Sequence, residues 1–221
     1  MLKKVNLGVL VSGSGSNLQS VIDNIELGRL DAEIKVIISN NPDAYALKRA
    51  KKHGIPSIVI DHSKYRNREL YDLKMIEILK SFSVELVVMA GFMRVLTATF
   101  LRAFPMKIMN IHPALLPSFQ GLHGQSGAFE YGVKFTGCTV HFADEGVDTG
   151  PIIIQAVVPV YDDDTVETLQ KRILKEEHRI YPQAIQLYAE KKLEIRGRRV
   201  HIRDHKKFEG LPQHNPPLEQ F

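Results

Sequence analysis

The strongest constraint on the fold is the alternation of strand-like and helical patterns in the first half of the chain. Apolar runs typical of buried parallel strands occupy 5–11, 34–39, 57–60 and 86–90. Helical patterns lie between them, the first starting after residue 17 and the others at 44–53 and 68–82. Because each strand–helix–strand step implies a right-handed crossover between parallel strands, the pattern predicts an α/β fold. We expect a Rossmann-like, mostly parallel twisted sheet with helices on both faces.

The length and composition predict a single domain with a substantial core. The chain has 221 residues, of which 44% are apolar, and it shows no internal repeat or low-complexity linker. We place the domain at 1–200 and a C-terminal tail at 201–221. The lone cysteine, Cys138, excludes an intramolecular disulfide and a cysteine-rich metal site, and its β-like surroundings favour a place in the core.

The net charge fits a small anionic ligand as easily as a nucleic acid, and the basic runs near the C-terminus do not favour a nucleic acid. A net charge of +4 is modest, and both signs are interspersed along most of the chain. The basic runs at 196–199 and 203–207 lack interleaved aromatic residues that could stack on bases, so we interpret this region as a solvated edge hairpin followed by a frayed end. No apolar run approaches the roughly 20 residues needed to cross a membrane, and no signal-peptide pattern follows Met1. We therefore expect a cytoplasmic protein with no membrane or nucleic-acid partner.

A loop rich in glycine and serine, SGSGSN at 12–17, joins the first strand to the first helix. Free amide groups at a helix start, together with the helix dipole, make such a loop a candidate anion site. The dinucleotide fingerprint fails because Leu18 stands where it requires glycine or alanine, and no Walker lysine is present. A plain turn with Ser16 or Asn17 as the helix N-cap explains the motif alone equally well.

The residues with the clearest chemical potential cluster between residues 110 and 150. Asn110 and His112 alternate onto the same face of a strand end, and Pro113 then ends the strand. In open α/β sheets, ligands bind at this rim, outside the carboxyl ends of the strands. A β-type run at 136–142 leads into an acidic, glycine-punctuated loop at 144–150. An amide, an imidazole and a carboxylate can therefore meet at one edge of the sheet.

The loop GFMRVL at 91–96 leaves the carboxyl end of the strand at 86–90 and should border the same crevice. Its apolar residues could line a flat aromatic ligand. Arg94 is as readily a solvated residue at a helix start as a ligand contact.

The segment DDDT at 162–165 should open a long helix, with its three carboxylates at the favourable end of the helix dipole. Its apolar stripe is interrupted by Glu177, and a carboxylate on a buried stripe needs a partner. Either Glu177 pairs with a nearby lysine or arginine, or it faces a pocket and binds ligand hydroxyl groups. Pro182 should kink or end the helix.

Several motifs of the chain resemble those of the glycinamide ribonucleotide formyltransferase family, from residue 5 to about residue 200. The matching segments are SGSGSNLQS, SNNPDAYALKRAKKHGIP, AGFMRVL, NIHPALLPSFQGLHG, TVHFADEGVDTGPIIIQ and EEHRIYP. Asn-x-His-Pro with a downstream aspartate loop marks the wider folate-dependent formyltransferases, and GSGSN and GLHG narrow the resemblance to this branch. The resemblance implies transfer of the formyl group of 10-formyltetrahydrofolate to the amine of glycinamide ribonucleotide in purine biosynthesis, without a metal.

The resemblance further implies that Asn110, His112 and Asp148 form the catalytic group. The glycinamide amine would attack the formyl carbon directly, giving a tetrahedral intermediate with a developing oxyanion. Asn110 would donate to that oxygen, and His112 would donate and later transfer a proton. Asp148 would favour the imidazolium and orient the ring. Thr139 would add a supporting hydrogen bond, and Gln120, where many relatives have proline, bears on the shape of the nearby loop.

The same resemblance assigns the residues that hold the two substrates. Gly15, Ser16 and Asn17 would bind the substrate phosphate, in agreement with the anion site, and Glu177 would meet the ribose or glycinamide end. The implied folate contacts are Arg68, Met93, Arg94, Val95, Leu96, Asp144, Glu145, Gly146, Val147 and Asp148. Both a monomer and a homodimer are compatible with these roles.

Three alternatives remain at this point. Methionyl-tRNA formyltransferase and the formylfolate hydrolases share the Asn/His/Asp group. The first carries an extra C-terminal domain for which we see no room here, and the hydrolases usually carry an N-terminal regulatory domain. The third alternative is a catalytically silent ligand-binding protein of the same fold, because fold alone does not fix function.

Overall fold

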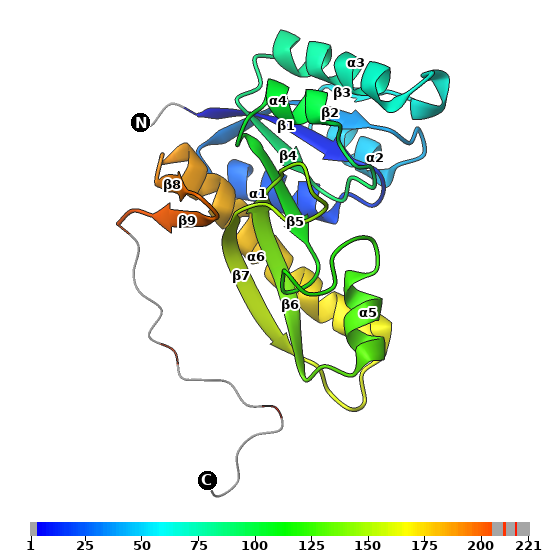
Figure 1. The fold of residues 1–221 in the computed structure, drawn as a ribbon. Helices are drawn as coiled ribbons and strands as arrows, with labels where there is room; N and C mark the ends of the chain where they lie inside the picture. Colours follow the sequence, from blue (N-terminus) through cyan, green and yellow to red (C-terminus); the bar gives the residue numbers. More distant parts are fainter. Residues whose placement is uncertain (1–3, 205–209, 211–214, 216–221) are drawn as a thin grey trace, which may run out of the picture.

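The central element is one sheet of nine strands with helices on both faces (Figure 1). The computed structural model describes residues 4–204, 210 and 215. The strand order is β3-β2-β1-β4-β5-β6-β7-β9-β8. The strands are β1 Val5–Val11, β2 Ala32–Ser39, β3 Ser57–Val59, β4 Leu86–Met89, β5 Ile108–His112, β6 Phe135–Phe142, β7 Ile152–Pro159, β8 Leu193–Arg196 and β9 Arg199–Ile202. The helices are α1 Ser16–Glu26, α2 Tyr45–Lys52, the 3-10 helix η1 His62–Lys64, α3 Arg68–Ser81, α4 Ala98–Ala103, α5 Gly124–Tyr131 and α6 Val166–Ala189.

The predicted strand–helix alternation is confirmed as a parallel half-sheet. β1 lies between β2 and β4, and the strands from β3 to β5 run parallel. This order brings the carboxyl ends of β1, β4 and β5 to one rim, where the loops that follow them open. The direction then changes, because β6 pairs antiparallel with both β5 and β7. Asn110 and His112 therefore lie on the last strand of the parallel half.

Helices α1, α2 and α6 cover one face of the sheet, and α3 and α4 cover the other (Figure 1). Leu18 of α1 and Ile173 of α6 belong to the larger core, where they pack with β1, β2 and β6. Tyr71 and Phe100 belong to the second core, against the opposite face of β1, β2 and β4. Cys138 is fully buried in the first core, which confirms its expected place.

Helix α6 continues through Pro182 to Ala189, so of the two predicted outcomes, a kink or an end at this proline, the end is wrong and the kink stays a prediction. Proline has no N–H with which to donate to the carbonyl one turn earlier, at His178. The hydroxyl of Ser20 in α1 donates to that carbonyl instead, at 2.7 Å. A side chain from another helix thus satisfies the acceptor that proline leaves free, on the residue that follows Glu177 in the same helix.

The expected edge hairpin is formed by β8 and β9. β9 pairs in parallel with β7 through Arg199 and Ile152, and β8 is the outermost strand. β9 extends to Ile202, past residue 200, and the domain boundary placed there stays a prediction. The frayed end and most of the second basic run lie outside the described residues.

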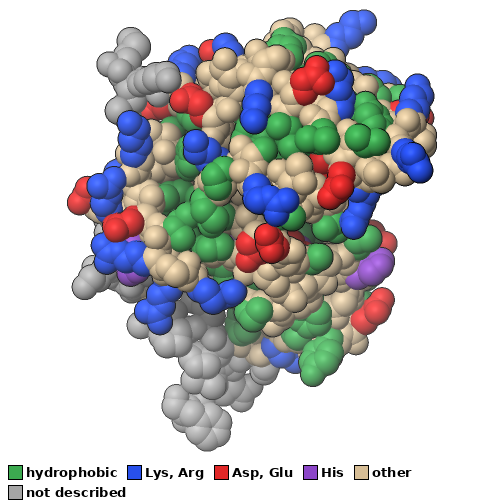
Figure 2. Space-filling model, turned by 45° about the horizontal axis from the view of Figure 1, so that its top comes forward, with side chains coloured by type: hydrophobic (Ala, Val, Ile, Leu, Met, Phe, Trp, Pro, Cys, Tyr) green, Lys and Arg blue, Asp and Glu red, His purple; other side chains and the backbone are tan. Residues whose placement is uncertain are grey.

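The charged side chains are mixed on the molecular surface. Lysine and arginine side chains are interspersed with aspartate and glutamate on the face shown in Figure 2. Within residues 4–204, no helix is both long enough and apolar enough to span a membrane.

Candidate active site

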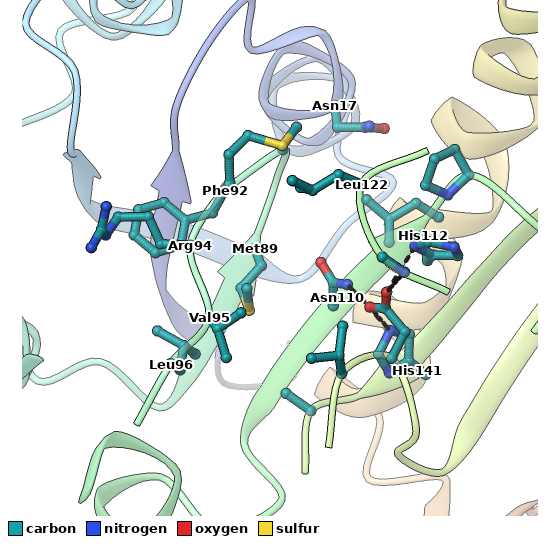
Figure 3. A pocket seen from close by; sticks show the side chains of 18 of the residues that line it. Asn17, Met89, Phe92, Arg94, Val95, Leu96, Asn110, His112, Leu122 and His141 are labelled. Carbon is teal, nitrogen blue, oxygen red and sulfur yellow. Dashed lines mark hydrogen bonds and ion pairs between the residues drawn. The ribbon is translucent and has the colours of Figure 1, made fainter. Parts of the chain in front are cut away.

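A cavity of about 410 Å³ lies where the loops after β1, β4 and β5 meet, and the acidic loop after β6 folds over it (Figure 3). Its lining divides into apolar and polar residues. The large apolar residues are Met89, Phe92, Met93, Val95, Leu96, Leu101, Ile111, Leu122, Val147 and Leu174. The polar residues are Ser16, Asn17, Arg94, Asn110, His112, Gln125, His141, Asp144, Asp148, Gln170 and Glu177. Most of the residues singled out from the sequence therefore surround one cavity.

The predicted catalytic residues Asn110, His112 and Asp148 lie together in the cavity wall (Figure 3). Asn110 Nδ2 donates to Asp148 Oδ1 at 3.3 Å. His112 Nδ1 lies 3.2 Å from Asp148 Oδ2. The carboxylate thus bridges the amide and the imidazole, and both of its oxygen atoms are used.

His112 meets a hydrogen-bond acceptor at each ring nitrogen. Nε2 donates to the carbonyl of Phe119 at 2.8 Å, while Nδ1 faces Asp148. A neutral imidazole has one N–H and satisfies one of these acceptors, whereas the imidazolium satisfies both. Burial nevertheless lowers the pKa of His112 below its ordinary value, although the charge of Asp148 and the Phe119 carbonyl push that pKa upward. The charge of Asp148 thus raises the pKa of His112, as expected, but burial lowers this pKa by more.

His141 is a cavity residue that the sequence analysis missed. Its Nε2 lies 3.2 Å from Asn110 Nδ2 and 3.5 Å from Asp148 Oδ1. Its Nδ1 donates to the Phe142 carbonyl at 2.9 Å, so in the neutral ring Nε2 is an acceptor. The sequence does contain one signal for His141. It lies two residues after Thr139, a spacing that places both side chains on one face of β6. The pairing of His141 with Asn110 across the antiparallel strands needed the structure.

The amide of Asn110 is fully engaged on its nitrogen side. Its two N–H groups point to Asp148 and His141, at 3.3 and 3.2 Å. The sequence-based role of Asn110, donation to an oxyanion, therefore requires that one of these two bonds be exchanged for the substrate oxygen.

The acidic loop holds Asp148 in an unusual backbone conformation. Its φ is 54°, in the left-handed region that aspartate and asparagine tolerate better than most residues. The loop also needs Gly150, where a Cβ would lie 1.8 Å from the carbonyl oxygen of Phe142. Burial alone would raise the pKa of Asp148, but the nearby imidazole of His141, the hydrogen bond from the Gly121 amide and the imidazole of His112 lower the pKa below its ordinary value. Asp148 is therefore ionised at neutral pH.

Two further contacts support the acidic loop. Thr149 Oγ1 donates to Asp144 Oδ1 at 2.5 Å. Arg198, in the turn between β8 and β9, donates to the carbonyl of Thr149 at 2.8 Å. Of the predicted folate contacts in this loop, all except Glu145 line the cavity.

Thr139 supports the loop after β5 and does not line the cavity. Its hydroxyl donates to the Ala114 carbonyl at 2.7 Å and accepts from the Leu116 amide at 3.1 Å. This matches the supporting hydrogen bond expected of it. Gln120, in the same loop, donates to the carbonyl of Asp148 at 3.2 Å. Gln120, which stands where many relatives have proline, thus connects the loop after β5 to the acidic loop through a hydrogen bond.

The start of α1 is open, which favours the anion-site interpretation over a plain turn. The N-cap is Gly15, and no side chain caps the helix, so the alternative with Ser16 or Asn17 as N-cap is wrong. Ser16 and Asn17 line the cavity instead. Gly15 has a φ of 69°, and a Cβ there would lie 2.7 Å from the Cβ of Ala46. Any side chain at Gly15 would therefore disturb the packing of α1 on α2, whether or not a phosphate binds.

Glu177 faces the cavity, and its hydrogen-bond partner is Asn17 rather than a lysine or arginine. Asn17 Nδ2 donates to Glu177 Oε2 at 2.7 Å. Burial raises the pKa of Glu177, and the bond from Asn17 opposes the rise. Asn17 Oδ1 is buried without a hydrogen-bond partner among the described residues. This pair therefore has acceptor capacity left for hydroxyl or amine groups of a ligand.

Residues 93–96 form the apolar wall opposite the catalytic group (Figure 3). The guanidinium of Arg94 lies over the ring of Tyr71, 5.5 Å from its centroid, and points away from His112. Arg68, the first residue of α3, is exposed and does not line the cavity. Its predicted folate contact stays a prediction.

The arrangement suits a reaction between two bound molecules. One end offers amide N–H groups and a buried acid, the middle offers an imidazole and an ionised carboxylate, and the far wall is apolar. In the described part of the chain, no group of three or more histidine, cysteine, aspartate or glutamate side chains is placed to hold a metal ion.

The chain matches a family model and several known proteins. The model described as Formyl transferase covers residues 5–185. The Drosophila melanogaster trifunctional purine biosynthetic protein adenosine-3 is 48% identical over 83% of this chain, which spans only 14% of that protein. Phosphoribosylglycinamide formyltransferase of Haemophilus influenzae is 40% identical over 91% of this chain and 94% of its own length.

The fold comparison agrees with the sequence comparison. The crystal structure of glycinamide ribonucleotide transformylase 1 from Symbiobacterium toebii superposes with a TM-score of 0.90 and 51% identity, covering 91% of this chain and 95% of that one. Because the family model spans most of the chain and the fold agrees, this chain belongs to the formyl transferase family.

Proposed function

We propose that the chain transfers the formyl group of 10-formyltetrahydrofolate to the amine of glycinamide ribonucleotide, a step of purine biosynthesis. The observation that carries the proposal is the meeting of Asn110, His112 and Asp148 at a cavity that also receives the open start of α1. The names of the Haemophilus influenzae and Symbiobacterium toebii proteins support this substrate pair.

In this proposal the two substrates enter the cavity from opposite ends. The substrate phosphate meets the amide groups of 15–17, where the helix dipole favours negative charge. Glu177 and Asn17 accept hydrogen bonds from the ribose hydroxyls or the glycinamide end. The flat ring of the folate lies against the apolar wall of 93–96 and against the acidic loop. The formyl carbon and the amine then meet beside Asn110 and His112.

The reaction needs no protein nucleophile, because the amine is itself a good one. The amine nitrogen bonds to the formyl carbon, and the carbonyl electron pair moves to oxygen. That pair returns as the bond from carbon to N10 of the folate breaks. One proton leaves the amine and one proton reaches N10, so the two products are neutral at these atoms.

His112 and Asn110 supply the hydrogen bonds and the proton transfer in this scheme. Nε2 of the His112 imidazolium exchanges its bond to the Phe119 carbonyl for one to the developing oxyanion or to the leaving nitrogen, while Nδ1 stays on Asp148, which stabilises the charged ring. Because burial lowers the pKa of His112, its imidazolium is a stronger proton donor than a free imidazolium. Asn110 exchanges a bond to His141 or Asp148 for one to the oxyanion.

One assay separates the proposed transferase from its alternatives. The protein is incubated with 10-formyltetrahydrofolate, with and without glycinamide ribonucleotide, and the release of tetrahydrofolate is followed. Turnover that depends on the amine supports the proposal. Turnover without the amine would identify a hydrolase, and binding without turnover would identify a silent ligand-binding protein.

We further propose the setting in which the activity operates. A single domain at 1–200 carries the whole site, and the enzyme acts in the cytoplasm as a monomer or homodimer. It uses two small molecules and requires neither a metal nor a nucleic-acid or membrane partner. The mixed surface charge supports this setting.

A further inference from the structure

We propose that Ser12 is a positioning residue for the folate side of the site, although its own loop at 12–17 belongs to the phosphate side. The residue ties the start of the folate loop, defined here as residues 91–97, to the end of β1. This inference rests on the proposed assignment of residues 93–96 to the folate.

Ser12 holds the folate loop through both its backbone and its side chain. The Ser12 amide donates to the carbonyl of Gly91 at 3.1 Å. The Met93 amide donates to the Ser12 hydroxyl oxygen at 2.9 Å. The backbone bond continues the β1–β4 pairing beyond the last strand residues, and the side-chain bond then holds the Met93 amide beside β1.

A third contact fixes the orientation of the Ser12 hydroxyl. Ser12 Oγ donates to Asn40 Oδ1 at 2.6 Å, in the loop after β2. Because the hydroxyl has one hydrogen, and Asn40 receives it, a lone pair is left for the Met93 amide. β1 lies between β2 and β4, so Ser12 is placed to contact the loops on both sides.

Packing holds only part of the folate loop, because Phe92 is 7% exposed and belongs to the second core. Met93 and Val95 are 63% and 52% exposed. The far end is fixed separately, because the amide and the hydroxyl of Thr97 both donate to the buried carboxylate of Asp72 at 2.7 Å. Removing the Ser12 hydroxyl therefore releases the Met93 amide, while the backbone bond from Ser12 to Gly91, the buried Phe92 and the far end at Thr97 stay in place.

The contrast with Ser14 makes the role of Ser12 specific. Ser14 lies two positions later in the same loop and is exposed, and its side chain makes no hydrogen bond within the described chain. Ser12 does not line the cavity, while Ser16 and Asn17 do. A hydroxyl at position 12 thus serves the neighbouring loop and not the phosphate.

Steady-state kinetics of Ser12→Ala and Ser14→Ala test the inference. Loss of one such hydrogen bond should raise the KM for 10-formyltetrahydrofolate about five- to tenfold in Ser12→Ala. The KM for glycinamide ribonucleotide should stay within about twofold of wild type, since the amides of 15–17 are untouched. Ser14→Ala should change neither KM. A merely structural loss would move both KM values and kcat together.

Two further variants keep the outcome decisive. Val95→Asp places a charge directly in the folate wall, and an unchanged folate KM there would show that the proposed folate site itself is wrong. If Val95→Asp raises the folate KM but Ser12→Ala does not, or raises the other KM instead, the role of Ser12 is overturned. Should Ser12→Ala fail to fold, Asn40→Ala frees the hydroxyl rotor and decides the question, with the same selective rise expected at smaller size.

Discussion

Ser20 donates its hydroxyl to the carbonyl of His178, the acceptor that Pro182 leaves without its helical partner. The bond joins α1 to α6 next to Glu177. The two elements that carry the proposed ribonucleotide contacts are therefore fastened to each other, and the proline is what makes the carbonyl available.

Ser20→Ala should lower the free energy of unfolding by about 1–2 kcal/mol, because it leaves the partly buried carbonyl of His178 without its donor. In a Pro182→Ala background, residue 182 regains an N–H that can serve the same carbonyl. In that background, Ser20→Ala should lower the free energy of unfolding by a smaller amount. Urea unfolding of the four proteins in this double-mutant cycle gives the coupling, and equal costs in both backgrounds would contradict the explanation.

Asn110→Ala and His112→Ala should each reduce kcat about a hundredfold or more while the fold is retained. Oxyanion donors and general acids are typically worth that much. Rates from the tetrahydrofolate-release assay, together with circular dichroism spectra of both variants, provide the check. Near-wild-type turnover in either variant would remove that residue from the catalytic group.

Asp148→Asn should lower the pKa of His112 further. The side chain keeps its size, asparagine tolerates the left-handed backbone, and the negative charge that opposes the effect of burial is lost. The fraction of imidazolium at neutral pH falls with it. NMR titration of His112 in wild type and variant makes the comparison, and an unchanged or higher pKa would restrict Asp148 to shaping the loop.

Glu177→Gln should raise the KM for glycinamide ribonucleotide about tenfold or more and leave the folate KM unchanged, because hydrogen bonds to a charged acceptor are the stronger ones. Glu176→Gln is the matched control, since Glu176 forms an ion pair with the exposed Arg179. Equal effects of both substitutions on KM would argue against a ligand contact at Glu177.

Asp164 should contribute stability that disappears in acid. Its carboxylate forms two hydrogen bonds of 2.7 Å with Arg172, which hold the pKa of Asp164 well below its ordinary value. A depressed folded-state pKa stabilises the protein above the unfolded pKa of 3.8 and loses that effect as the pH falls through the folded value. Asp164→Asn should therefore cost about 2 kcal/mol at pH 7 and progressively less below pH ~4.

The control for this experiment is Asp162→Asn. Asp162 pairs with Lys134 at 2.7 Å, but its side chain is 92% exposed. Exposed pairs contribute little to stability. The free energy of unfolding of this variant should therefore equal that of wild type both at pH 7 and below pH ~4. If the difference in the free energy of unfolding between Asp164→Asn and wild type stays constant as the pH changes, titration of Asp164 is excluded as its cause.

Local periodicity was sufficient to predict the fold, and the reason is visible in β1. A continuous apolar run needs cover on both faces of its strand. The structure provides this cover, because β1 lies between α1 on one face and α3 on the other. The same kind of reasoning placed Asn110 and His112 on one face. It also brought the acidic loop at 144–150 to the same edge of the sheet, but the choice of Asp148 within that loop came from the family resemblance.

What the sequence could not supply depended on contacts between distant segments. His141 becomes a site residue through its antiparallel register with Asn110. The continuity of α6 depends on Ser20, and the need for glycine at position 15 depends on Ala46 as much as on any phosphate. Each of these partners is remote along the chain, so no local pattern could reveal it.

The hydrogen bond from Arg198 to Thr149 crosses the limit of the part that matches the family model, which ends at residue 185. The turn of the β8–β9 hairpin supports the backbone one residue after Asp148. The orientation of the Asp148 carboxylate therefore depends in part on the β8–β9 turn, which lies outside the segment matched by the family model. Exchanging this hairpin between relatives would adjust the set of the acidic loop, and so the protonation of His112, without altering any residue of the cavity.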